Sequence, residues 1–182
     1  MKQKANTKTS FNQESVMKKF FAVLAASALS MIIVESSFAQ ATATQNVTLA
    51  VNTVYKIAAS GNPGPLTITT GTAGVDALTS VNDASTTYSI TQNFGNTVKV
   101  TAHLDAALVS GYILDMNLAS TKGTSAGTID ISNATSGSAV DVVTNIARGA
   151  DAGQIITYTF SANASSGTLA STAKVVTLTL TN

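Results

Sequence analysis

The chain has 182 residues, of which 10% are charged and none is a cysteine. Without cysteine it can form neither a disulfide nor a metal–thiolate site, so its fold must depend on packing and hydrogen bonds. Beyond residue 39 it carries five cations and seven aspartates, which give a net charge of −2. So few, scattered cations argue against a surface for nucleic acid or for an anionic membrane.

Residues 17–39 have the three parts of an export signal. Residues 17–19 (MKK) form a basic n-region, residues 20–34 are a fifteen-residue apolar run, and residues 37–39 (SFA) are a small-x-small cleavage motif. The apolar run is shorter than the ~20 residues of a membrane-spanning helix. We therefore expect cleavage after Ala39 and a mature protein that is secreted, either extracellular or at the cell surface.

The domain organisation follows from this signal. Residues 1–16 are polar and unpatterned, and we interpret them as lying before the true start codon at Met17 or as an extended n-region. Residues 40–52 are expected to form an N-terminal strand arm, and residues 53–182 one β-sandwich domain. The 143 residues left after removal of the first 39 of 182 suffice for one domain with its own core.

Alternation of apolar and polar residues recurs between clusters of Gly, Ser, Asn and Asp, which is typical of strands with one buried face. In chain order, the predicted strands are residues 45–59 (divided near Asn52), 66–68, 78–81, 88–94, 98–104, 112–118, 129–131, 140–146, 156–160 and 176–180. Many short strands without a helical pattern favour an all-β fold, an immunoglobulin-like antiparallel β-sandwich.

The segments between these strands predict the connections. Residues 94–96 (FGN) indicate a hairpin that joins strands 88–94 and 98–104. Residues 105–111 form a connection with room for one helical turn. Loops are predicted at residues 120–127 and 148–153.

The first patterned segment is too long for one ordinary strand. Residues 45–59 would extend over ~50 Å at 3.3 Å per residue, whereas strands usually have about 5–6 residues. We expect its second half to join the sheet of the domain and its first half to be an arm with Val47, Leu49 and Val51 on one face. Such an arm can fold back on its own domain or add a strand to the sheet edge of a neighbour.

One motif suggests hydrolase chemistry. Residues 123–127 (GTSAG) match the G-x-S-x-G nucleophile elbow, which needs a helix after the serine and a histidine later in the chain. The segment after Ser125 is predicted to be a strand, and the single histidine, His103, comes earlier. We therefore predict no catalytic role for either residue and no enzymatic activity.

Neither a metal site nor another cofactor site is predicted. The aspartates lack the D-x-D-x-D-G spacing of a calcium loop, although convergence of Asp76, Asp105 and Asp151 from separate loops stays open as an alternative. The tyrosines fall on inward faces, so we do not expect the exposed aromatic platform of a carbohydrate-binding module. They are Tyr55, Tyr88, Tyr112 and Tyr158.

The signal, arm, sandwich and strand-forming C-terminus together resemble the secreted β-sandwich subunits of bacterial surface filaments, such as pili and fimbriae, that are joined by donor-strand complementation. The resemblance is architectural. Chaperone–usher pilins commonly carry a disulfide and an aromatic residue near the C-terminus, whereas this chain has no cysteine and ends in residues 178–182 (LTLTN).

The resemblance implies a structural protein that self-assembles into a homo-oligomer, filament or extracellular matrix. Val47, Leu49 and Val51 would then form the inter-subunit donor strand. The alternative is a monomeric secreted module for adhesion or ligand binding, whose ligand the sequence does not identify. Neither function involves nucleic acid or, after signal cleavage, a membrane.

Overall fold

The computed structural model describes residues 42–182, which contain nine strands and no α-helix. The chain divides into two units, Met1–Leu49 and Ala50–Asn182. All nine strands belong to the second unit, and residues 42–54 form no strand. Among the described residues, no helix is long and apolar enough to cross a membrane. The expected signal peptide and its cleavage site lie outside these residues.

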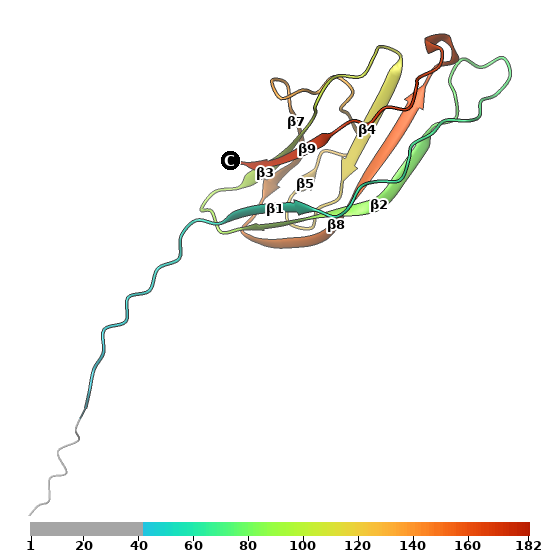
Figure 1. Cartoon of the computed structure of the whole chain (residues 1–182). Coiled ribbons are helices and arrows are strands. Elements are labelled where there is room, and N and C mark those ends of the chain that lie inside the picture. Colours follow the sequence, from blue (N-terminus) through green and yellow to red (C-terminus); the bar gives the residue numbers. More distant parts are fainter. Residues whose placement is uncertain (1–41) are drawn as a thin grey trace, which may run out of the picture. The chain divides into compact units, whose positions relative to one another are not determined.

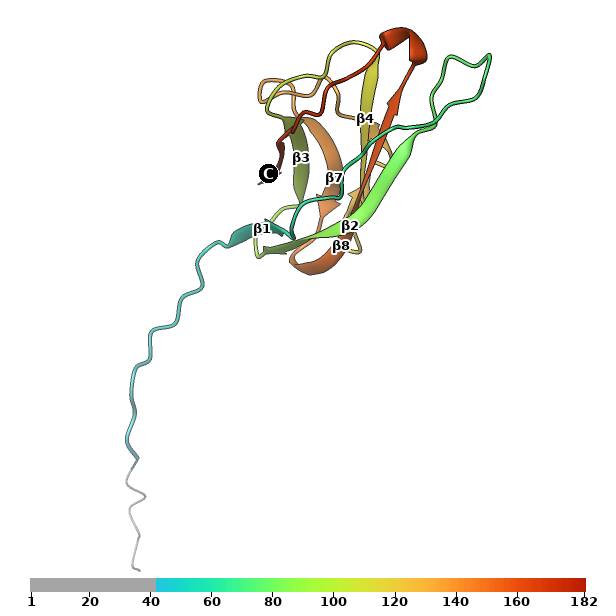
Figure 2. The ribbon, with the colours of Figure 1, turned by 45° about the vertical axis from the view of Figure 1, so that its right-hand side comes forward.

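Two antiparallel sheets form the second unit, as Figures 1 and 2 show. The chain is therefore all-β, with two sheets as expected of a sandwich. The first sheet consists, in spatial order, of β1 (Tyr55–Ala59), β2 (Val81–Gln92), β8 (Gly149–Ala162), β4 (Tyr112–Leu118) and β6 (Ile129–Asp130). The second consists of β5 (Thr124–Ser125), β7 (Val140–Ile146), β3 (Val98–Leu104) and β9 (Val176–Thr181).

From β2 onward, successive strands alternate between the two sheets. Among consecutive strands, β1 and β2 alone share a sheet, with pairs from Tyr55↔Gln92 to Ala59↔Tyr88. Every later connection therefore carries the chain from one sheet to the other.

The hairpin expected at residues 94–96 is wrong. Strand β2 pairs with β1 and β8, whereas β3 pairs with β7 and β9 in the other sheet. Buried Gln92 supports this crossing, since its Oε1 accepts a hydrogen bond from the Phe94 N–H (2.7 Å) and its Nε2 donates one to the Ile146 carbonyl (3.2 Å). Alternation alone does not separate a hairpin from a crossing, because both keep the apolar face inward.

Apolar residues from both sheets form one core. Strands β3 and β4 bury every second residue, as their sequence pattern predicts. The largest fully buried side chains include Tyr88, Leu104, Met116, Leu118, Ile131, Ile146 and Ile156. The inward faces of these strands were therefore predicted correctly.

Strand β8 begins inside the loop predicted at residues 148–153, so that prediction is wrong. Asp151 pairs with Ile90 and Gln154 with Tyr88, which leaves two residues on β8 opposite one on β2. Gly153 has a φ of +64°, and its N–H donates to Ser89 Oγ (3.0 Å). Gly153 thus marks a β-bulge in a continuous strand.

Two other predicted connections and one predicted strand also differ from the structure. The helical turn lies at Ala164–Ser166, and residues 105–111 contain none. Residues 66–68 form no strand, and the short strand β5 lies within the loop predicted at residues 120–127. Such short segments have too few residues for a reliable periodic pattern.

Candidate functional site

The arm presents a stripe of exposed apolar side chains. Val47, Leu49 and Val51 are exposed to 72%, 87% and 88%. Single exposed apolar residues are ordinary on protein surfaces. Three at alternate positions, in a segment that pairs with no strand within residues 42–182, however, have the pattern that a strand needs to cover the edge of a sandwich.

Asn93 holds the chain at the point where the arm joins the sandwich. Its Nδ2 donates to the Asn52 carbonyl (2.8 Å), and its Oδ1 accepts from the Val54 N–H (2.6 Å). Its own N–H donates to the Val54 carbonyl (3.2 Å), which extends the β1–β2 ladder by one step. Within residues 42–182, Asn52 is thus the first residue of the chain that these hydrogen bonds hold.

Strand β9 is an edge of the second sheet. All six of its residues pair with β3, from Lys99↔Thr181 to Leu104↔Val176, and no strand within residues 42–182 pairs with its other side. Its inward residues Val176, Leu178 and Leu180 pack against the core but stay half-buried. The core is therefore incompletely covered along β9.

Strand β1, one of the two edge strands of the first sheet, lies beside β9. Residues of β1 contact residues of β9, and both strands lie on the same side of the sandwich in Figure 1. The inward residues of β1, Tyr55 and Ile57, are also half-buried. Each of these two neighbouring strands thus carries half-buried apolar side chains that pack against the core. We call the four residues Tyr55, Ile57, Leu178 and Leu180 the β1–β9 strip.

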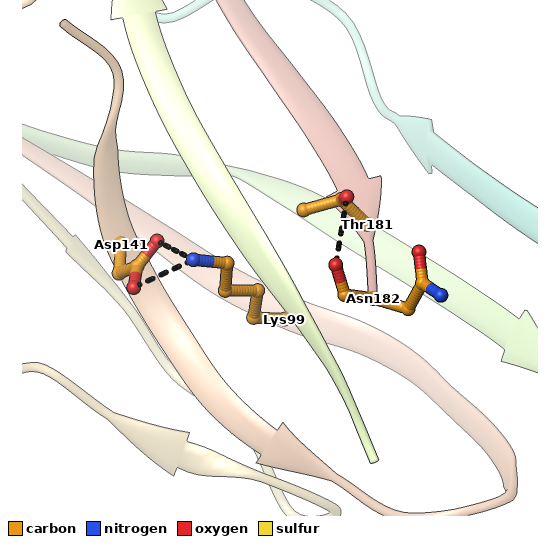
Figure 3. Close-up of polar contacts among 4 residues, drawn as sticks. All are labelled: Lys99, Asp141, Thr181 and Asn182. Atoms are coloured by element: carbon orange, nitrogen blue, oxygen red, sulfur yellow. Dashed lines mark hydrogen bonds and ion pairs between the residues drawn. The ribbon is translucent and has the colours of Figure 1, made fainter. Parts of the chain in front are cut away.

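The outward face near the end of β9 carries one ion pair. Lys99 Nζ lies 2.9 Å from Asp141 Oδ1 and 3.0 Å from Oδ2, and the two side chains point toward each other in Figure 3. Both side chains are about two-fifths exposed, at 41% and 43%. An ion pair this exposed contributes little to stability, about 0–1 kcal/mol.

A hollow of about 260 Å³ lies next to this ion pair. Figure 3 shows Thr181 and Asn182 at the nearby end of β9, where Thr181 Oγ1 donates to the Asn182 carbonyl (3.3 Å). The lining residues are Thr97, Val98, Lys99, Thr144, Asn145 and Asn182. Lys99 is the one titratable side chain among them.

Ser125 and His103 are not brought together. Ser125 ends β5 opposite Val143 of β7, whereas His103 lies on β3 opposite Thr177, and β7 separates the two strands. Ser125 Oγ lies 3.3 Å from Asn117 Oδ1 and accepts a hydrogen bond from the Gly127 N–H (3.1 Å).

Backbone requirements explain both glycines of the G-x-S-x-G match. A Cβ on Gly123 would lie 2.8 Å from the Thr144 carbonyl oxygen and 2.8 Å from Val143 Cγ1. Gly127 has a φ of +78°, in the left-handed region. The next strand in the chain is β6, where a nucleophile elbow would continue into a helix. The motif therefore reflects the close approach of β5 to β7.

Sequence reasoning missed the role of Asp151, which it placed in a loop. This residue is 2% exposed, and its carboxylate accepts hydrogen bonds from Ser120 Oγ (2.7 Å), Thr121 N (2.9 Å), Thr121 Oγ1 (2.7 Å) and Lys122 N (3.2 Å). Burial by itself raises the pKa of Asp151, but these hydrogen bonds outweigh it and hold that pKa below its ordinary value. Burial, together with the nearby Asp151 carboxylate, raises the pKa of Tyr88 to about 12.

The loop aspartates do not converge. Asp76 accepts hydrogen bonds from the N–H and Oγ of Ser165 (both 2.8 Å), and Asp105 Oδ1 accepts one from the Val175 N–H (3.1 Å). No group of three or more metal-ligating side chains is found within residues 42–182. Each of these carboxylates instead fixes a nearby stretch of backbone.

No family model matches the chain, and no similar curated protein or solved structure was found. The resemblance to filament subunits therefore stays a prediction from architecture alone.

Proposed function

We propose that the protein is an exported structural subunit that self-assembles by β-strand donation into a filament or matrix at the cell surface. The arm, residues 40–52, is the donor. The observation that carries this proposal is the alternating exposed stripe of Val47, Leu49 and Val51, in a chain whose sandwich also leaves apolar side chains half-covered. Low charge and abundant small polar residues are in keeping with an assembly role.

The energy of such a joint supports reversible assembly of many subunits. Burial of the three side chains contributes roughly 4.5–9 kcal/mol, at about 1.5–3 kcal/mol each. Fixing the backbone costs about 1–2 kcal/mol per residue. Since these magnitudes are similar for a five-residue segment, main-chain hydrogen bonds to an unpaired edge must supply the remainder. Repetition along a filament would then hold subunits together without disulfides.

The distribution of the strands between the two sheets bears on the type of sandwich. An immunoglobulin-like sandwich keeps some successive strands in one sheet through hairpins. Here the strands alternate between sheets from β2 to β9, with β2-β8-β4-β6 in one sheet and β9-β3-β7-β5 in the other. This alternation favours a jelly-roll type of sandwich over the immunoglobulin-like one.

Charge placed on the stripe tests the function. Leu49→Asp should block assembly of the mature protein, because strand donation would bury the carboxylate against an apolar surface. Thr48→Asp is the matched control, since strand donation would place its side chain on the opposite face of the added strand. Size-exclusion chromatography at several concentrations and electron microscopy measure the outcome. If the unchanged protein stays monomeric at every concentration, the proposed function is wrong.

A second candidate function is a monomeric ligand-binding module, and the hollow beside Lys99 is the observation that favours it. At about 260 Å³ the hollow is smaller than typical ligand pockets of about 300–1,000 Å³. Its lining is mostly uncharged and polar. We therefore place this function second.

A further inference from the structure

We infer that the free edge of β9, together with the β1–β9 strip, is the surface that receives the arm of a second copy of this chain. The inference rests on the proposed strand donation and names its acceptor. The arriving segment is Val47–Val51, which would extend the second sheet beyond β9. Its apolar stripe would cover the strip, and its polar face would continue the outer face of β9.

Comparison of the four sheet edges selects β9. The edge strands β5 and β6 have two residues each, too short to pair with a five-residue donor. Strand β1 has Lys56 on its exposed face, a charge of the kind that discourages edge pairing. Strand β9 has six residues without charge or proline, and its pairing with β3 shows no bulge. It is therefore the least protected edge.

The free edge of β9 also has its main-chain groups in a suitable direction. The Asp105 N–H donates to the Val175 carbonyl (2.9 Å), so this pair is a hydrogen-bonded position of the ladder. By the alternation of an antiparallel pair, the N–H and C=O groups of Val176, Leu178 and Leu180 point away from β3. These three residues can therefore pair with an added strand.

The arm repeats the sequence pattern of β9. Residues 47–51 read VTLAV and residues 176–180 read VTLTL, with apolar residues at the same alternate positions. A segment with this pattern suits a half-buried position at the edge of this sandwich. At about 3.4 Å per residue the donor spans ~17 Å and β9 ~20 Å, so the lengths also match.

The polar faces are compatible. Thr177, Thr179 and Thr181 lie on the outward face of β9, and Thr48 and Ala50 lie on the corresponding face of the arm. None of these residues is charged, so no like charges would be placed opposite each other. Threonines at facing positions pack well in neighbouring strands.

Disulfide crosslinking between two copies tests the acceptor, since a chain without cysteine gives no background disulfide. A mature Thr48→Cys variant is mixed, under oxidising conditions, with Thr177→Cys, Thr179→Cys or Thr181→Cys. At these β9 positions the facing Cβ atoms would lie close enough for a disulfide. We expect a disulfide-linked dimer that is several-fold more abundant with at least one β9 variant than with the control Lys56→Cys on β1.

Other crosslinking results would contradict either the acceptor or the proposed function. Crosslinking that favours Lys56→Cys, or assembled protein that crosslinks at none of the three β9 positions, overturns β9 as the acceptor and leaves strand donation intact. An intramolecular disulfide in monomeric Thr48→Cys/Thr179→Cys shows that the arm pairs within its own chain and overturns the inference. Variants and parent that stay monomeric, with no crosslink, overturn the proposed function itself.

Discussion

Asp151 joins the segment between β4 and β5 to β8 through one buried carboxylate. Its donors come from three successive residues, Ser120, Thr121 and Lys122. A carboxylate has acceptor sites for all of them, whereas an amide has one oxygen and adds donors of its own. The conformation of residues 120–122 is therefore fixed by a residue about thirty positions away. The chain has no disulfide that could fix such a segment.

Substitution of Asp151 should measure this contribution. Asp151→Asn should lower the free energy of unfolding by about 2–4 kcal/mol, because buried donors are left without an acceptor. Denaturant-induced unfolding checks this value. Asp141→Asn is the control, since it removes an ion pair that is about two-fifths exposed and should cost less than about 1 kcal/mol. Equal losses in the two variants would contradict the role of Asp151.

The lowered pKa of Asp151 also predicts acid sensitivity. Because its folded-state pKa lies below the ordinary value of about 3.9, the carboxylate stabilises the fold fully above about pH 5 and loses this effect as the pH falls through the folded-state pKa. Asp115 has the opposite sign, since burial and the nearby Asp130 raise its pKa. Its contribution is present at low pH and is lost as the pH rises through its folded-state pKa.

The urea midpoint of the parent protein should therefore fall more steeply below about pH 4 than that of Asp151→Asn. Asp115 is present in both proteins and cancels in this comparison. Parallel pH profiles of the two proteins would show that Asp151 does not carry the acid dependence.

At the scale of elements, the end of β2 organises two connections. Gln92 points inward and holds the crossing to β3 beside the end of β7, through Phe94 and Ile146. Asn93 is the next residue and points the other way, where it binds the backbone of Asn52 and Val54. Since neighbouring residues of a strand face opposite sides, one strand end supports both the crossing and the base of the arm.

Asn93→Ala should loosen the base of the arm with little effect on the sandwich. We expect a loss of about 0.5–1.5 kcal/mol in the free energy of unfolding, because the hydrogen bonds are exposed. Amide exchange at residues 52–54 should become faster, as followed by mass spectrometry. Gln92→Ala is the comparison and should cost more, since it removes a buried side chain from the core. Unchanged exchange at residues 52–54 would show that Asn93 does not fix them.

At the scale of the whole molecule, the four sheet edges are unequally protected. Two are short and one carries a lysine, whereas β9 is uncharged and six residues long. Exposed edges of this kind promote pairing between chains. Most contacts in the fold also join residues far apart in the sequence, which makes folding slow and leaves edges exposed for longer. The same property that would promote assembly therefore also favours aggregation.

Export of the whole molecule is expected from the sequence of residues 17–39 and can be tested directly. The mature protein should begin at Gln40, because the apolar run at residues 20–34 is followed by the small residues Ser37 and Ala39. Intact mass and N-terminal sequencing of the protein recovered from the culture medium or cell surface measure this. A mature protein that keeps Met17 would be incompatible with cleavage.

The sequence by itself determined most of the strands. The bounds of β3, β4 and β7 and the inward faces of β3 and β4 follow from alternation over seven residues, a local property that survives in the fold. The division near Asn52, expected from strand length, stays a prediction. For the arm, the sequence supplied the stripe of Val47, Leu49 and Val51, whose pairing stays a prediction.

Only the tertiary structure decided which sheet each strand joins and which polar side chains hold the connections. Asp151, Gln92 and Asn93 bind groups roughly thirty to fifty residues away in the chain, and no local pattern records such a partner. A glycine at position 153 is compatible with either a loop or a β-bulge. Whether residues 148–153 form a loop or a bulged strand depended on whether β2 lies opposite to pair with them. That pairing is a property of the assembled sheet. The local sequence of residues 148–153 is compatible with both structures.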